Sequence, residues 1–264
     1  MESHFILKVL VSFVAAGIWI GSVTLIAERL GSKRGGLIAN LPSTVLIALV
    51  FVGLVNDAGF AALATRAVPV GMTIDTIFLM VFIILLKRSL VTAVLLSLST
   101  WMVLAYTAGQ IHCSSMAFTI LIYFLVAITS FLILEYRFEI PSKGKSRKKF
   151  TPLNSMVRVL FAGSVVAGTT IISAFAGAYW VGLFSTFPAV MLSTMVILTL
   201  NQGTAFARAT GKVMILASTN IIIYALGVSI TYPALGITLG TIASFVFSFF
   251  WVLLLHPLIN KISK

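Results

Sequence analysis

Apolar runs long enough to cross a membrane follow one another along this chain with almost no polar sequence between them. A helix needs about 20 apolar residues to cross the roughly 30 Å hydrocarbon layer of a bilayer. With 60% hydrophobic and only 9% charged residues, the chain lies outside the range of soluble domains, so we expect an all-α polytopic membrane protein. Nine spans are predicted, at 5–28, 35–56, 64–86, 89–109, 114–136, 156–177, 179–200, 206–229 and 232–256.

The basic residues predict how the chain is oriented in the membrane. A net charge of +12 would indicate a nucleic-acid partner in a soluble protein, but here the charges sit in short loops, so no nucleic-acid partner is expected. The stretch "YRFEIPSKGKSRKKFTPLNS" is the only extended polar segment, and its basic cluster indicates a cytoplasmic linker. Alternation then puts sixteen of the eighteen Lys and Arg residues inside and leaves Lys8 and Arg66 outside. We predict an outside N terminus and a cytoplasmic C terminus.

The sequence of the first half recurs in the second half. "KVLVSFVAAG" from position 8 resembles "RVLFAGSVVAG" from 158, and "GGLIANLPSTVLIALVFVGLVND" from 35 resembles "VGLFSTFPAVMLSTMVILTLNQG" from 181. With a one-residue gap, "ALATRAVPVGMTIDTIF" from 62 matches "ARATGKVMILASTNIII" from 207. Because five spans separate the two starts, the repeats enter the membrane in opposite directions. The predicted units are a four-helix repeat over 1–110, a connecting helix with the basic loop over 111–155, and an inverted four-helix repeat over 156–264.

Inverted repeats are a recurring plan of secondary transporters, because two half-units related by an axis in the membrane plane can open to either side. This architecture favours transport of a small solute or ion by alternating access. The alternative is that the duplication only enlarges a helix bundle.

One aspartate, Asp75, stands inside the apolar run "VGMTIDTIFLM" and aligns with Asn220 of the second repeat. Each lies about 12 to 14 Å into its span, near the middle of the layer. A charge at that depth costs at least about 2.5 to 3.5 kcal/mol, and the basic residues are all expected at span ends. We therefore predict a central polar site where Asp75 binds a cation or carries a coupling proton. The alternative is an aspartate that only fixes helix packing. The neighbours that would line this site are Thr73, Thr76, Ser218 and Thr219.

A second duplicated feature is a proline inside spans two and seven, Pro42 and Pro188. Proline breaks or kinks a helix, and freed backbone groups survive in a membrane only inside protein or beside a cavity. If the helix restarts there, its first N–H groups would suit an anionic ligand group. The other interpretation is a kink satisfied by hydroxyl side chains. The small polar residues at the two breaks are Asn40, Ser43, Thr44, Ser185 and Thr186.

Other motifs carry little chemistry. The single cysteine, Cys113, excludes an internal disulfide and a cysteine-based zinc site, and His112 beside it has no third metal ligand in view. No Ser/His pair, paired acids or metal-ligand spacing occurs inside the spans, so we expect neither an enzyme nor a cofactor. Small residues in "AAGIWIGS" and "AGSVVAGTT" predict close helix contact in spans one and six.

The stretch "YWVGLFSTFPAVMLSTMVILTLNQGTAFARAT" resembles the GlpM-like small bacterial membrane proteins in its paired aromatics, glycine-leucine step, apolar-proline step and downstream glycine. This resemblance implies a fused, inverted pair of such units in a bacterial inner membrane, and it implies no particular activity. A four-plus-one-plus-four plan is also similar to the drug/metabolite transporter superfamily and the small multidrug exporters. The exporters carry a glutamate in their first span, whereas the acid here is Asp75 in span three, so their substrate residues cannot be carried over.

A membrane secondary transporter is the function that the sequence favours, with a small molecule or ion as substrate and a proton or cation as coupling partner. A channel, a lipid flippase and a non-transporting subunit of a membrane assembly are the alternatives. A channel predicts a polar stripe along several spans, and none continues beyond the central cluster. The basic loop would suit a flippase, although the inside bias of positive charge already explains it. The sequence indicates no substrate, direction or oligomeric state.

Overall fold

The structure, a computed structural model, describes residues 2–29, 41–113, 115–140 and 152–262, and in these ranges it is helical without strands. Several helices, or runs of successive helices, are long and apolar enough to cross a membrane, which confirms the predicted all-α polytopic class. Seven are found in the described part of the chain, at His4–Val23, Ala58–Leu85, Leu90–Ile111, Met116–Arg137, Leu153–Ile172, Ala178–Gln202 and Thr204–Leu255. The apolar helix Ser43–Val55 is shorter.

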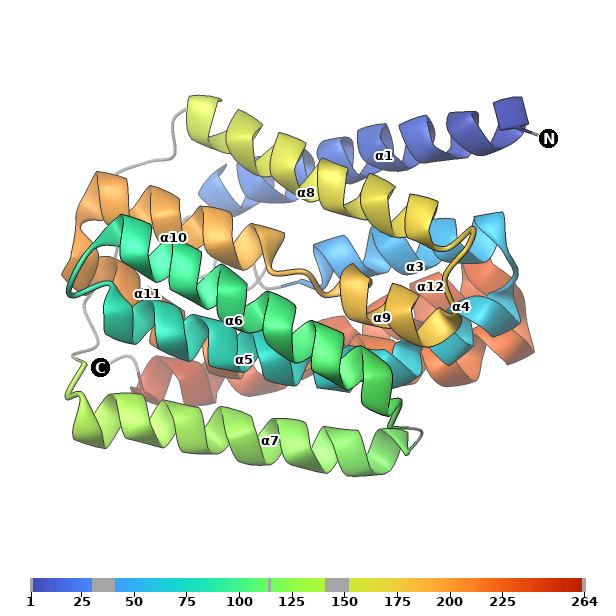
Figure 1. Cartoon of the computed structure of the whole chain (residues 1–264). Helices are drawn as coiled ribbons and strands as arrows, with labels where there is room; N and C mark the ends of the chain where they lie inside the picture. Colours follow the sequence, from blue (N-terminus) through green and yellow to red (C-terminus); the bar gives the residue numbers. More distant parts are fainter. Residues whose placement is uncertain (1, 30–40, 114, 141–151, 263–264) are drawn as a thin grey trace.

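The helices follow the chain in the order that Figure 1 labels. They are α1 (Glu2–Arg29), α3 (Ser43–Val55), α4 (Ala58–Ala64), the 3-10 turn η1 (Thr65–Ala67), α5 (Val68–Leu85), α6 (Leu90–Ile111), α7 (Met116–Leu132), the π-helical turn η2 (Ile133–Arg137), α8 (Pro152–Ile172), α9 (Ala178–Ser185), α10 (Ala189–Gln202), α11 (Thr204–Ala217) and α12 (Thr219–Ile262).

Helices α1 and α8 lie together along one side of the bundle, drawn at the top of Figure 1, and α7 lies along the opposite side. The α1–α8 contact is close because glycines leave room: Gly17 meets Val159, and Gly163 meets the backbone of Phe13. Since residues early in α1 face residues late in α8, the two helices are antiparallel. The predicted close contact between the small residues of spans one and six is confirmed.

Two helices begin directly after a proline, with nearly the same backbone geometry. Pro42 precedes α3 with φ −74° and ψ 52°, and Pro188 precedes α10 with φ −76° and ψ 42°. In each case the next residue donates its N–H to the carbonyl of the residue before the proline, at 2.7 Å. Of the two interpretations left open for these prolines, the structure has a helix that begins after each of them, and α9 precedes the second. The corresponding stretch before Pro42, which includes Asn40, lies outside the described residues.

Other helix ends follow from local chemistry. Asp57, Ser89 and Ser115 each accept a hydrogen bond from the N–H three residues later and so cap α4, α6 and α7. The predicted third span starts earlier than expected, at Ala58, and continues through η1 into α5. The predicted eighth span is interrupted at Ser218, where α11 ends and α12 begins.

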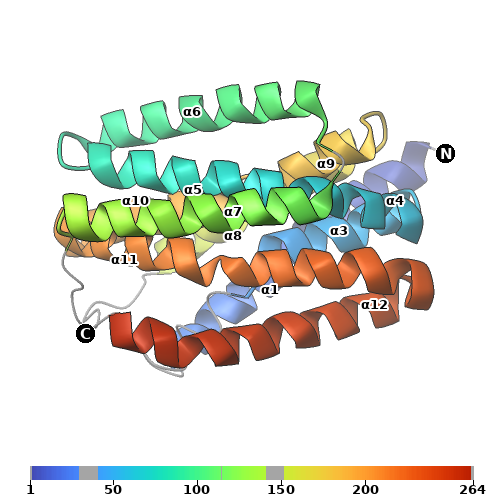
Figure 2. The same cartoon turned by 90° about the horizontal axis from the view of Figure 1, so that it is seen from below.

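Helix α12 is two arms joined by a sharp turn at Gly236, whose φ of 73° and ψ of −179° are not helical. Glycine suits this turn because it carries no Cβ. Figure 2 shows the arms running back along each other. The Thr231 hydroxyl donates to the Gly240 carbonyl at 3.0 Å near the turn, and the Trp251 indole donates to the Thr219 hydroxyl at 3.0 Å near the far end.

The start of α1 and the end of α12 lie at opposite ends of the bundle in both views (Figures 1 and 2). At the end where α1 starts, the Lys8 ammonium donates to the Leu54 carbonyl in the last turn of α3. A cation suits that position because the last carbonyls of a helix have no intrahelical partner.

Candidate polar site in the bundle core

Asp75 lies in the middle of α5 and is only 2% exposed. Its carboxylate accepts a hydrogen bond from the indole N–H of Trp101 in α6, at 2.8 Å. Among the acids whose side chains the structure describes, Asp75 is the one buried in the core. Two threonines predicted to line the site donate to the backbone of α5 instead: the hydroxyl of Thr73 donates to the Pro69 carbonyl and that of Thr76 to the Met72 carbonyl.

Trp101 is a functional candidate that the sequence analysis missed. The signal in the sequence was a tryptophan inside an apolar span. Such an indole is expected to be buried, and a buried indole N–H usually has a hydrogen-bond acceptor. Trp101 is 1% exposed, and its ring packs edge-on against Phe187 at 4.9 Å between ring centroids. Phe184 lies 6.4 Å away on the other side of the same helix break. Trp101 thus connects Asp75 to the α9–α10 break.

The α9–α10 break also reaches α5 directly. Gly71 lies one turn before Asp75 in α5, and a Cβ at this position would stand 2.1 Å from the Thr186 hydroxyl oxygen. Only glycine allows so close an approach. Because residues four apart share a helix face, Asp75 and this contact lie on the same side of α5. The structure therefore brings Thr186 next to the neighbourhood of Asp75.

A second helix break approaches from the other side. The Tyr123 hydroxyl of α7 lies 3.1 Å from the Ser218 hydroxyl at the α11–α12 break, and both residues are buried. Ser218 already donates to the Ile215 carbonyl at 2.9 Å, so Tyr123 is the donor of this pair. Helix α7 packs against α5, so the Tyr123–Ser218 contact belongs to the same buried core as Asp75.

Thr219 and Asn220 are buried, and each has a hydrogen bond to the second arm of α12. Thr219 accepts the indole N–H of Trp251, and the Asn220 backbone carbonyl accepts the Ser248 hydroxyl at 3.2 Å.

Hydroxyls at the proline breaks are engaged with their own backbone. Ser185 donates to the Gly182 carbonyl at 2.7 Å and Thr186 to the Leu183 carbonyl at 2.8 Å, which satisfies the end of α9. Ser43 donates to the Leu41 carbonyl at 3.3 Å. Thr44, beside it, is half-buried. These bonds match the interpretation in which Ser and Thr hydroxyls donate to the backbone carbonyls freed at the break. They give no support to an anionic ligand group at the helix starts.

Two buried aromatic side chains lie in α5 between Asp75 and the C-terminal end of the helix. Phe78 and Phe82 follow Asp75 by about one and two turns, are fully buried, and have ring centroids 6.1 Å apart. The Ile83 carbonyl then accepts a hydrogen bond from the Arg208 Nε at 2.9 Å. A cation here caps the last turn of α5.

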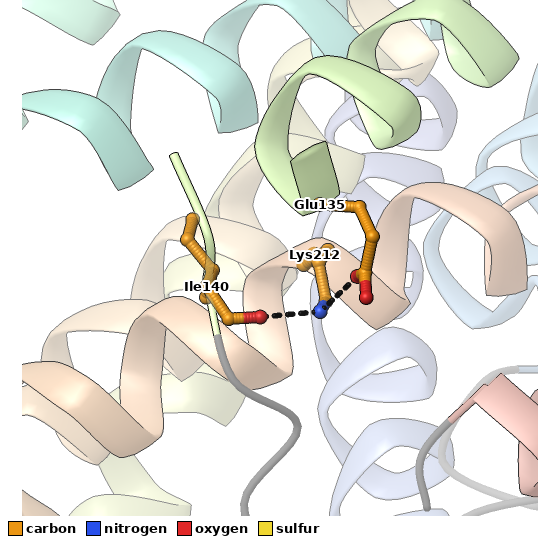
Figure 3. A network of polar contacts seen from close by, with 3 residues as sticks. All are labelled: Glu135, Ile140 and Lys212. Atoms are coloured by element: carbon orange, nitrogen blue, oxygen red, sulfur yellow. Dashed lines mark hydrogen bonds and ion pairs between the residues drawn. The ribbon is translucent and has the colours of Figure 1, made fainter. Parts of the chain in front are cut away.

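The position of Lys212 corrects the expectation that all basic residues sit at span ends. Lys212, from α11, has a side chain with no exposed surface. As Figure 3 shows, its ammonium lies between the Glu135 carboxylate, at 2.5 Å, and the Ile140 carbonyl, at 2.6 Å. Glu135 was not among the residues predicted for the site. Glu135 belongs to the π-helical turn η2, and turns of this kind often mark functional positions.

Comparison with known proteins adds one match. Residues 9–114, less than half of the chain, match the model of a family described as a protein of unknown function (DUF3147). This stretch runs from α1 through α6, close to the first predicted repeat, and includes Asp75 and Trp101. Nothing in it connects the chain to GlpM-like proteins or to a transporter family. No curated protein and no solved structure gives a significant match.

Proposed function

We propose that this chain is a membrane secondary transporter of a small solute or ion, and that Asp75 is the residue that binds the coupling proton or cation. The observation that carries the proposal is the burial of this acid in a bundle core that also contains two helix breaks. An ionisable group inside a membrane bundle is costly, and it is normally retained for a function. Irregular backbone at membrane depth likewise occurs where it is buried in protein or lines a substrate path.

The predicted inverted repeat is the second support for the transporter proposal. The matching backbone angles at Pro42 and Pro188, and the antiparallel packing of α1 against α8, fit two four-helix units of opposite direction. A chain whose first and last helix ends lie at opposite ends of the bundle fits an odd number of crossings, such as the nine proposed. We place the N terminus outside and the C terminus in the cytoplasm of a bacterial inner membrane.

In this mechanism the bundle alternates between states that expose the Asp75 site to opposite sides. We assign the arrangement described above to a closed state of this cycle; the supporting observations are that Phe78 and Phe82 follow Asp75 along α5 and that Trp101 packs on Phe187 at the α9–α10 break. When Asp75 gains a proton or a cation, the charge that resists dehydration is neutralised, so the loaded site can pass through this closed state.

The test is accessibility measured separately from each side of the membrane. With Cys113→Ser as background, single cysteines replace Thr73 and Ser218 in oriented vesicles, and a membrane-impermeant thiol reagent is added to one side at a time. Alternating access predicts that both positions react, each from either side. Ala93→Cys is the control, because Ala93 is fully buried away from the site and should stay unreactive.

Asp75→Asn, built into both cysteine variants, adds the coupling readout. An amide mimics the neutral carboxyl, so the balance between labelling from the two sides should change and lose its dependence on pH. If neither cysteine reacts from either side in any variant, the polar cluster is dry packing, and a non-transporting subunit of an assembly becomes the better interpretation.

A further inference from the structure

A groove lies on the outer part of the bundle, away from Asp75. It has a volume of about 490 Å³ and runs between α4, the turn η1, the start of α7 and the first arm of α12. One charged residue, Arg66, and one hydroxyl residue, Ser229, face a lining that is otherwise small or apolar. The residues that matter below are Leu63, Arg66, Met116, Ser229 and Pro233.

Arg66 is exposed, although Thr65 and Ala67 on either side of it are fully buried. Within the described ranges, no residue accepts a hydrogen bond from its guanidinium or forms an ion pair with it. This differs from Arg208, which caps a helix end, and from Lys212, which is paired with Glu135. The Arg66 guanidinium is therefore exposed and available to a ligand in the groove.

The depth of Arg66 determines what it meets there. The apolar run Ala58–Leu85 has 28 residues, about 42 Å of helix, which is close to the roughly 40–45 Å thickness of a bilayer with its headgroups. Arg66 is eight residues from the start of that run, about 12 Å along it. A guanidinium at this depth must reach up to the headgroup layer or bring an anion down to itself. Lipid phosphate is the anion present at that level.

The lining fits an amphiphile with one negative charge. Guanidinium groups bind phosphate through paired hydrogen bonds, while Leu63, Met116 and Pro233 offer apolar surface to an acyl chain. The groove has no acidic side chain that would receive the ammonium of a zwitterionic headgroup. The Ser229 hydroxyl donates to the Leu226 carbonyl, so Arg66 supplies the charge recognition. We propose that this groove binds one anionic phospholipid, with its phosphate on Arg66 and one acyl chain along Leu63, Met116 and Pro233.

The site is independent of the transport proposal, and it is tested on the full chain in detergent. Native mass spectrometry follows the retention of phosphatidylglycerol and phosphatidylcholine during lipid titration. Wild type should hold one phosphatidylglycerol preferentially, and Arg66→Gln should weaken that binding at least about tenfold. Arg88→Gln is the matched control: it removes the same charge from an exposed arginine in the turn between α5 and α6, and it should bind like wild type.

A second pair of variants tests the acyl chain. Leu63→Trp fills the groove and should weaken phosphatidylglycerol binding, whereas Leu95→Trp, on an exposed face of α6, should not. Excess inorganic phosphate should fail to displace the lipid. The proposal is overturned if Arg66→Gln retains phosphatidylglycerol as wild type does, or if wild type shows no preference between the two lipids. Displacement by inorganic phosphate, or binding unaffected by Leu63→Trp, would mean a small-anion site and would also overturn it.

Discussion

The Lys212–Glu135 pair makes an asymmetric prediction, because the two partners are buried to different degrees. The Lys212 side chain has no exposed surface, while the Glu135 side chain is 36% exposed. Glu135→Gln therefore leaves an ammonium in the protein interior without the carboxylate that lies against it. Breaking a buried pair in this way costs about 3–5 kcal/mol of the free energy of unfolding. Lys212→Met leaves a carboxylate that water can reach, so its cost should be nearer about 1 kcal/mol.

The assay is the heating midpoint of the detergent-solubilised protein, read as the fraction that stays monodisperse by size exclusion. A loss of 3 kcal/mol corresponds to a drop of about 6 °C or more. Glu135→Gln should lower the midpoint by at least that amount and Lys212→Met by clearly less. The double variant should have a higher midpoint than Glu135→Gln alone, because it no longer buries an ammonium without its carboxylate.

The matched control is Glu139→Gln, which neutralises an exposed acid near the same turn and should leave the midpoint unchanged. The reasoning is refuted if Lys212→Met destabilises as much as Glu135→Gln, or if the double variant shows the sum of the two losses. Either result would mean that the difference in burial does not decide the energetics of the pair.

Three further variants test other contacts in the same heating assay. Trp101→Phe removes the one N–H that the structure places on the Asp75 carboxylate, so it should cost about 1–3 kcal/mol, and less when Asp75→Asn is already present. Gly71→Ala forces a Cβ to within 2.1 Å of the hydroxyl at the α9–α10 break and should lower the midpoint by several degrees. Gly236→Ala puts a Cβ where φ is 73° and ψ is −179°, a conformation found almost only for glycine, and should cost about 1–3 kcal/mol. For the two glycine changes the control is Gly177→Ala, where a Cβ meets nothing within 4 Å; equal losses in the control and the test variants would contradict both predictions.

Much of the fold was predictable because membrane spans can be recognised in a sequence by their length and apolar composition. The apolar runs located the helices, and the two prolines located two helix starts, since proline cannot continue the hydrogen bonding of a helix. The turn at Gly236 was placed within a few residues, between the last two spans. The break at Ser218 was not predictable, because no proline or glycine marks it, and its polar residues Ser218, Thr219 and Asn220 were interpreted as lining a site within a continuous span.

The candidate site was predictable in its central residue only. An acid inside an apolar run is visible in sequence, and Asp75 lies in the core. Its partner Trp101 was not identified, because which side chain donates depends on how α5 and α6 are rotated against each other. The same holds for Lys212, whose burial depends on η2 folding over α11 and bringing Glu135 to it. Side-chain partners across helices follow from packing, which sequence periodicity does not resolve.

The hairpin of α12 also bears on how the protein enters its membrane. Its arms carry polar groups that would each be expensive to insert alone, including Thr231 and Ser244, whose hydroxyls lie 2.9 Å apart across the turn. Because these groups pair across the turn, the arms can leave the translocon together as one preassembled unit with its polarity already hidden. The 44 residues of α12 would then be inserted in a single event. A chain truncated after the turn at Gly236 would leave the polar groups of the first arm without their partners, which raises the free energy of inserting that arm.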